Sequence, residues 1–178
     1  MVTIIFEPHS TTFNNEAHIA SGWDDVELSP LGTKQAKELG ERREGEYFDA
    51  IFCSDLKRSY KTADIAFNGK FPVIKDKKLR ECDYGDLTSH PEDEVKPLKI
   101  KYIKTSFPNG ESFEQAMQRM KEFLEDLLKN YNGKKVMIIG HRATQYGLEY
   151  FINNLSLQKI ITTHWFWQPG WEYKLENI

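Results

Sequence analysis

Two histidines and an arginine stand where a chain could carry phosphoryl-transfer chemistry. His9, Arg58 and His141 each come shortly after a short apolar run. A neutral imidazole can attack phosphorus, while guanidinium groups hold phosphoryl oxygens and offset developing charge. A carboxylic acid would still be needed to protonate the leaving oxygen. Together these residue types indicate transfer of a phosphoryl group.

Three buried strands are the elements that must position these side chains. They are predicted at residues 2–6, 50–53 and 135–139, which are short β-branched or apolar runs bounded by polar, Gly or Pro residues. The carboxyl ends of parallel strands meet at one edge of a sheet, where open α/β folds bind ligands. We therefore expect His9 and His141 to lie close together.

Helical patterns alternate with these strands. Ser29 and Pro30 begin a predicted helix that ends near Arg43, with Leu31 on its inner side, and Ser54 or Asp55 is expected to cap the next. Further helices are predicted at residues 56–67, 92–104, 111–131 and 143–153. Residues 160–167 and 171–175, with Trp165, Trp167 and Trp171, are predicted to form a closing hairpin. The alternation favours an α/β fold with a mostly parallel sheet between two helical layers.

Length and composition set outer limits on the function. The 178 residues fit one domain over residues 1–178, and a net charge of −3 argues against a nucleic-acid partner. No apolar run approaches the ~20 residues of a membrane span, so we expect no membrane partner and a cytoplasmic location. Cys53 and Cys82 are expected to be buried free thiols. An edge strand in the closing hairpin could support a homodimer.

Five short motifs in order carry a family resemblance that covers nearly the whole chain. The chain resembles the histidine phosphatase superfamily, in its phosphoglycerate mutase-like branch. The matching stretches are Gly22-Trp23-Asp24-Asp25 with Leu28-Ser29-Pro30-Leu31-Gly32, Ser54-Asp55-Leu56-Lys57-Arg58, Leu79-Arg80-Glu81 with Tyr84-Gly85, Gly110-Glu111-Ser112 with Arg119, and Gly140-His141.

The resemblance implies a role for each matching residue. His9 would be the nucleophile, Arg58 and His141 would bind the transferring phosphoryl group, and Glu81 would be the general acid. Asn15 would contact phosphate or, alternatively, form a local turn. Ser10 could donate its hydroxyl, and Trp23 could line the pocket. The resemblance implies a small phosphorylated metabolite as substrate, and no metal or organic cofactor.

One departure from the family pattern concerns the residue before the nucleophile. The family motif is Arg-His-Gly, whereas this chain has Pro8-His9-Ser10. The lost phosphate clamp could cost about 3 kcal/mol, or two decades of rate. Arg142, directly after His141, is a candidate replacement, and a surface salt bridge is the alternative for its side chain.

Plainer interpretations and rival functions stay open at this point. Arg58 could pair with Asp55, and Glu81 could be a solvated loop acid. Lysines at positions 96, 99, 101 and 104 could line the pocket rim and favour a multiply anionic substrate, or they could form a solvated face. The resemblance favours a phosphatase, because the chain lacks the long insertions that mutases of this family carry over the active site. A phosphoglycerate-type mutase and a catalytically weakened binder are the alternatives.

Overall fold

A five-stranded sheet forms the centre of the protein, whose computed structural model describes residues 1–178. The strand order is β3-β2-β4-β1-β5, and every neighbouring pair is parallel except β1 with β5. The strands are β1 (Val2–Pro8), β2 (Ala50–Cys53), β3 (Val73–Lys75), β4 (Lys135–Gly140) and β5 (Trp171–Leu175). The expected mostly parallel α/β sheet is confirmed.

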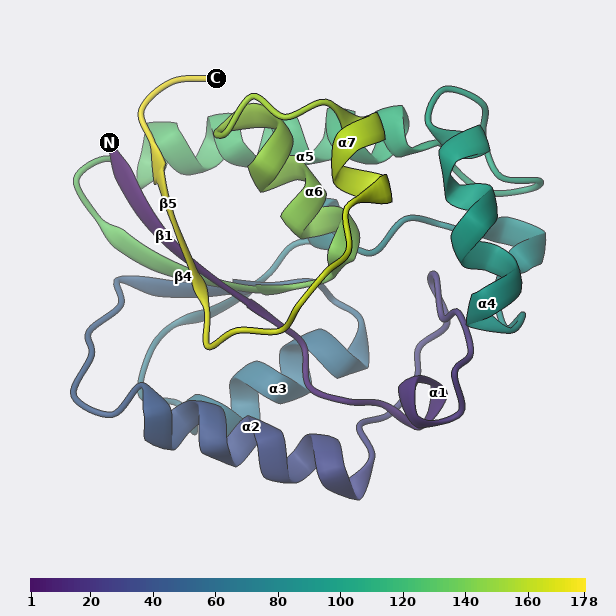
Figure 1. Cartoon of the computed structure of the whole chain (residues 1–178). Helices are drawn as coiled ribbons and strands as arrows, with labels where there is room; N and C mark the ends of the chain where they lie inside the picture. Colours follow the sequence, from purple (N-terminus) through teal and green to yellow (C-terminus); the bar gives the residue numbers. More distant parts are fainter.

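Helices cover both faces of this sheet, as Figure 1 shows. On one face lie α2 (Pro30–Arg42) and α3 (Lys57–Phe67), and on the other α5 (Phe113–Asn130), α6 (Arg142–Phe151) and α7 (Leu157–Thr162). The shorter elements are α1 (Phe13–Glu16), α4 (Glu92–Val95) and the 3₁₀ helices η1 (Lys77–Leu79), η2 (Gly85–Leu87) and η3 (Lys96–Tyr102). No helix is both long enough and apolar enough to cross a membrane.

Alternate side chains of the central strands divide the core between the two layers. Ile4 and Phe6 of β1 belong to the cluster packed against α5, whereas Ile5 belongs to the cluster packed against α2 and α3. Val136 and Met137 of β4 separate in the same way. This follows from the period of two along a strand, and burial on both faces explains why the strands are continuously apolar.

Helix α2 begins as the sequence predicts. The Ser29 hydroxyl accepts the Gly32 backbone N–H at 3.1 Å, and Pro30 is the first helical residue. The inner face holds Ala36 and Leu39, but Leu31 is 47% exposed, so its predicted inward position is wrong. In the first turn the residue that packs inward is Gly32, which lies against the Thr11 backbone, and Leu31 points outward.

The predicted cap of α3 is also wrong. Leu56 is the N-cap residue, and no side chain caps the helix. Asp55 is engaged elsewhere, since both of its oxygens accept hydrogen bonds from Arg80 at 2.6 and 2.7 Å. The Ser54 hydroxyl lies 2.7 Å from a ring nitrogen of His141. Contacts with His141 and Arg80 therefore engage the two side chains that were predicted to cap the helix.

The predicted closing hairpin is absent. Residues 160–162 are the end of α7, residues 163–170 are irregular, and β5 pairs with β1. Ser156 caps α7, and Leu157 and Ile160 are buried at helical spacing against the α6 side of the core. β5 instead pairs antiparallel with the outer edge of β1, from Val2 with Leu175 to Phe6 with Trp171.

Candidate active site

The strand register brings the two predicted histidines together. Pro8 pairs with Gly140, so the residues that follow them, His9 and His141, leave adjacent strands at the same edge. The centroids of the two imidazole rings are 5.1 Å apart, with an angle of 54° between the ring planes. The predicted convergence of the two rings is therefore present in the structure.

His9 is held as a neutral imidazole. Burial lowers its pKa to about 3, helped by the positive charge of Arg58. Its Nδ1 lies 2.8 Å from the carbonyl oxygen of Ser10, and a carbonyl can only accept a hydrogen bond. The hydrogen-bond pattern thus assigns the proton to Nδ1 and leaves a lone pair on Nε2. This is the form of histidine that acts as a nucleophile.

His141 is buried beside it with one ring nitrogen free. The residue is 2% exposed, and its Nε2 lies 2.7 Å from the Ser54 hydroxyl. Burial, Arg58 and His9 hold its pKa well below the usual value. Its Nδ1 is buried and has no hydrogen-bond partner. A buried polar atom without a partner is costly, and an oxygen of a bound phosphoryl group could satisfy it.

Arg58 supplies a buried positive charge that no carboxylate neutralises. It is 2% exposed, and its two terminal nitrogens donate to the carbonyls of Gly22 and Asp24 at 2.7 Å each. No carboxylate oxygen lies within 4.0 Å of it, so the plainer pairing with Asp55 does not occur. Burial lowers its pKa, yet a guanidinium stays protonated in proteins. Three of its five N–H donors remain for an anion.

Glu81 is a buried carboxylate rather than a solvated loop acid. It is 8% exposed, and it accepts backbone N–H bonds from Cys82 at 2.8 Å, Arg142 at 3.1 Å and Ala143 at 3.2 Å. The last two donors belong to the first turn of α6, so backbone contacts with that helix fix the position of the carboxyl group. Glu81 and His9 line the same cleft. The carboxylate is therefore tied to the helix that begins directly after His141.

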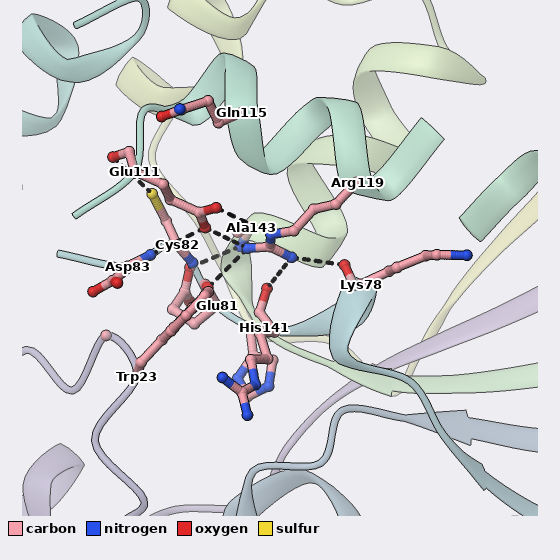
Figure 2. A network of polar contacts seen from close by, with 12 residues as sticks. Trp23, Lys78, Glu81, Cys82, Asp83, Glu111, Gln115, Arg119, His141 and Ala143 are labelled. Carbon is pink, nitrogen blue, oxygen red and sulfur yellow. Dashed lines mark hydrogen bonds and ion pairs between the residues drawn. The ribbon is translucent and has the colours of Figure 1, made fainter. Parts of the chain in front are cut away.

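The segment that carries Glu81 is held from behind by Arg119, as Figure 2 shows. Arg119 of α5 donates to the carbonyls of Lys78, Arg80 and Glu81 and to both oxygens of Glu111. All five of its N–H donors are used. The sequence marked Glu111 and Arg119 only as part of a motif. Their contact with the Glu81 segment was missed, because backbone carbonyl acceptors leave no signature in the sequence.

Trp23 supports the same segment and does not line the cleft. Its indole N–H donates to the Glu81 carbonyl at 2.6 Å, and its ring lies under the Arg80 guanidinium, 4.7 Å away. The residues that line the cleft do not include Trp23. The prediction that Trp23 lines the pocket is therefore wrong, and its side chain instead supports the backbone of Glu81.

The cleft has a volume of about 820 Å³, and Ser10 and Asn15 both line it. The Ser10 backbone N–H donates to the Thr62 hydroxyl, which fixes the turn after the nucleophile. Asn15 forms a reciprocal cap with Thr12 at the start of α1, which is the local turn that the sequence left as an alternative. Its side-chain oxygen is thus committed, whereas its amide N–H₂ group remains for a ligand.

Arg142 is held by aromatic side chains instead of by a salt bridge. Its guanidinium carbon lies 5.0 Å from the Tyr146 ring centroid and 5.1 Å from that of Trp165. One of its nitrogens donates to Gln145 Oε1 at 2.5 Å. All four residues line the cleft, and this aromatic setting was missed by sequence reasoning because Trp165 was assigned to a hairpin.

Two of the four lysines also reach the cleft. Lys96 and Lys99 line it, whereas Lys101 and Lys104 do not. Cys53 and Cys82 are free and fully buried, as expected. No group of three or more His, Cys, Asp or Glu side chains is arranged to hold a metal ion.

A mostly parallel sheet whose ligand edge presents two neutral imidazoles and an unpaired guanidinium defines a protein of the histidine phosphatase class. The chain belongs to the histidine phosphatase superfamily (branch 1), whose family model matches residues 4–165. Phosphatases and phosphoglycerate mutases both occur among the proteins it resembles.

Three relatives illustrate this range. Phosphoserine phosphatase 1 of Hydrogenobacter thermophilus is 30% identical over 96% of this chain and 82% of its own length. A 2,3-bisphosphoglycerate-dependent phosphoglycerate mutase of Cytophaga hutchinsonii is 30% identical over 90% of this chain and 81% of its own length. Among solved structures, YhfR of Bacillus stearothermophilus superposes with a TM-score of 0.82 at 25% identity, covering 95% of this chain and 88% of that one.

Proposed function

We propose that the protein is a phosphomonoesterase that hydrolyses a small phosphorylated metabolite through a phosphohistidine on His9. The observation that carries this proposal is the 5.1 Å separation of the His9 and His141 ring centroids beside the unpaired cation of Arg58. A buried guanidinium without a carboxylate is unfavourable on its own, and a phosphoryl dianion would compensate it.

In the first step, Nε2 of His9 attacks phosphorus. The N–P bond forms as the P–O ester bond breaks, and the leaving oxygen takes a proton from the carboxyl group of Glu81. The three unused N–H donors of Arg58 and Nδ1 of His141 are available to the equatorial oxygens, where negative charge develops. Because these groups are already in place, little reorganisation accompanies the reaction.

In the second step, water attacks the phosphorus of phosphohistidine. The N–P bond breaks, the lone pair returns to His9, and Glu81 accepts the proton of the attacking water. Inorganic phosphate leaves, and the free enzyme is regenerated with Glu81 protonated for the next cycle.

One observation supports a weaker relative that binds a phosphorylated ligand without turnover. Pro8 stands where the family has arginine, and it brings no charge to the strand end. Loss of one charged donor would cost about 3 kcal/mol of transition-state stabilisation. Such a protein would keep the anion site but would release phosphate slowly.

The deciding experiment compares the wild type with His9→Ala on p-nitrophenyl phosphate and on phosphoglycerates, with Lys121→Ala as a matched surface control. We expect phosphate release by the wild type and the control and none by His9→Ala. Isomerisation of phosphoglycerate without phosphate release would replace the phosphatase with a mutase. One phosphate bound per His9, with slow release, would replace it with the binder.

A further inference from the structure

One cation of the cleft has no part in the proposed transfer of the phosphoryl group. Arg142, Gln145 and Tyr146 are spaced i, i+3 and i+4 along α6, so their side chains share one helix face. Trp165, from the irregular segment between α7 and β5, covers this face. The Arg142 guanidinium thus lies against two aromatic rings within the same cleft as His9.

This guanidinium is fixed in orientation but not neutralised. Gln145 Oε1 accepts from Arg142 at 2.5 Å and from the Trp165 indole N–H at 3.0 Å, which ties the three side chains together. No carboxylate lies within 4.0 Å of Arg142, and four of its five N–H donors are unused. A planar, stacked guanidinium loses little further freedom when it binds an oxyanion.

Three of the four acidic side chains that line the cleft already have hydrogen-bond or ion-pair partners. Glu7 is paired with Arg42 and Arg43, Glu81 accepts three backbone N–H bonds, and Glu38 is paired with Lys34. Glu92, at the start of α4, is exposed and has no ion pair.

The lining cations outside the phosphoryl site show the opposite pattern. Arg42 is paired with Glu7, but Arg142, Lys96 and Lys99 have no ion pair, and the Lys99 ammonium lies 5.0 Å from the centroid of the Tyr84 ring. The cleft therefore carries surplus positive charge in addition to that of Arg58. A single phosphoryl group bound between His9 and Arg58 would leave this charge unused.

We propose that Arg142 binds a second oxyanion of the substrate, a carboxylate or a second phosphate, while the transferred phosphoryl group lies between His9 and Arg58. The inference rests on the proposed function and names the substrate class: small phosphate esters with a second anionic group. Because Arg142, His9 and Arg58 line one cleft, a single substrate bound there can contact both anion sites. Arg142 is then a specificity residue and not a substitute for the missing arginine at position 8.

Matched substrates separate these two roles. Phosphoserine and phosphoethanolamine differ only by a carboxylate, and fructose 1,6-bisphosphate and fructose 6-phosphate differ by one phosphate. We expect the wild type to prefer the member with the second anion in at least one pair. Arg142→Ala should raise the KM of that member about tenfold or more, leave kcat unchanged and shift the KM of the simpler member less than about threefold. Arg142→Lys should recover part of the preference, and Lys121→Ala, on exposed α5 surface, should keep it.

Two results would overturn the inference. One is an equal loss for both members of each pair in Arg142→Ala, which would indicate a clamp on the transferred phosphoryl group or a structural role. The other is a wild type without preference in either pair. If no compound is hydrolysed, the proposed function fails separately. Calorimetric titration of phosphoserine and phosphoethanolamine into the protein then decides on Arg142: a difference in Kd that disappears in Arg142→Ala supports the second site, and any other result overturns it.

Discussion

Replacement of Arg119 by methionine should weaken the fold at the point where it supports Glu81. The guanidinium makes five hydrogen bonds, two to Glu111 and three to the carbonyls of residues 78, 80 and 81. Methionine keeps most of the side-chain length and removes every donor. Glu111 would retain only the backbone N–H of Asp83 as a partner for its carboxylate.

The size of the effect follows from the burial of the pair. Breaking a buried ion pair costs about 3–5 kcal/mol. The Arg119 and Glu111 side chains are 17% and 15% exposed, so water reaches the site and the lower end of about 3 kcal/mol applies. For a chain of 178 residues this corresponds to a fall in Tm of about 6–12 °C. Phosphate release should fall as well, since the Glu81 segment loses its support.

The assay is urea unfolding of four proteins: the wild type, Arg119→Met, Glu111→Met and the double variant. The double variant should lose less stability than the sum of the single ones, because each single change strands a charge that the double change removes. Lys121→Met on the same helix should stay within about 0.5 kcal/mol of the wild type. A loss below about 1 kcal/mol in Arg119→Met, or strict additivity in the double variant, would refute the argument.

Three further predictions follow from burial near the site. An NMR titration of His9 should show no protonation between pH 8 and pH 5, because its pKa is lowered to about 3. The unfolded chain takes up that proton near pH 6.5, so the free energy of unfolding should decrease as the pH falls below 6.5. His9→Gln should flatten this slope by up to about 1.4 kcal/mol per pH unit. Burial raises the pKa of the Cys53 thiol to about 12 and that of Cys82 further, so neither should react with a disulfide reagent at pH 8 until urea unfolds the chain, and rapid native labelling would contradict the burial. Gly32→Ala should destabilise the protein by about 1–3 kcal/mol, because the new Cβ would lie 1.9 Å from the Thr11 carbonyl oxygen, whereas Lys34→Ala on the exposed face of α2 should change unfolding in urea very little.

The strand ends were predictable because they depend on local patterns and one rule of topology. The apolar runs before His9 and His141 mark buried parallel strands, and parallel strands present their carboxyl ends at one edge. Contact between the two imidazoles also requires β1 and β4 to be neighbouring strands, which the pairing of Pro8 with Gly140 provides and which local patterns do not predict. The Ser29 cap of α2 was predictable for the same reason, since cap and helix are adjacent in sequence.

The missed features depend on partners far along the chain. Trp165 reaches Arg142 from an irregular segment that has no periodic pattern, and its neighbouring β-branched residues suggested a strand. Ser54 and Asp55 have the residue types of a helix cap, but His141 and Arg80 engage them instead. Tertiary contacts of this kind override local preference, and they are concentrated around the site.

The position of β1 between β4 and β5 has a consequence for synthesis on the ribosome. This strand is made early, yet its partners are residues 135–140 and 171–175. Until the first of these has left the exit tunnel, the apolar side chains of β1 have no sheet to join and are open to association with other chains. A nascent chain stalled before β4 should therefore be bound by chaperones, and it cannot bring its two imidazoles together, because the second of them has not yet been made.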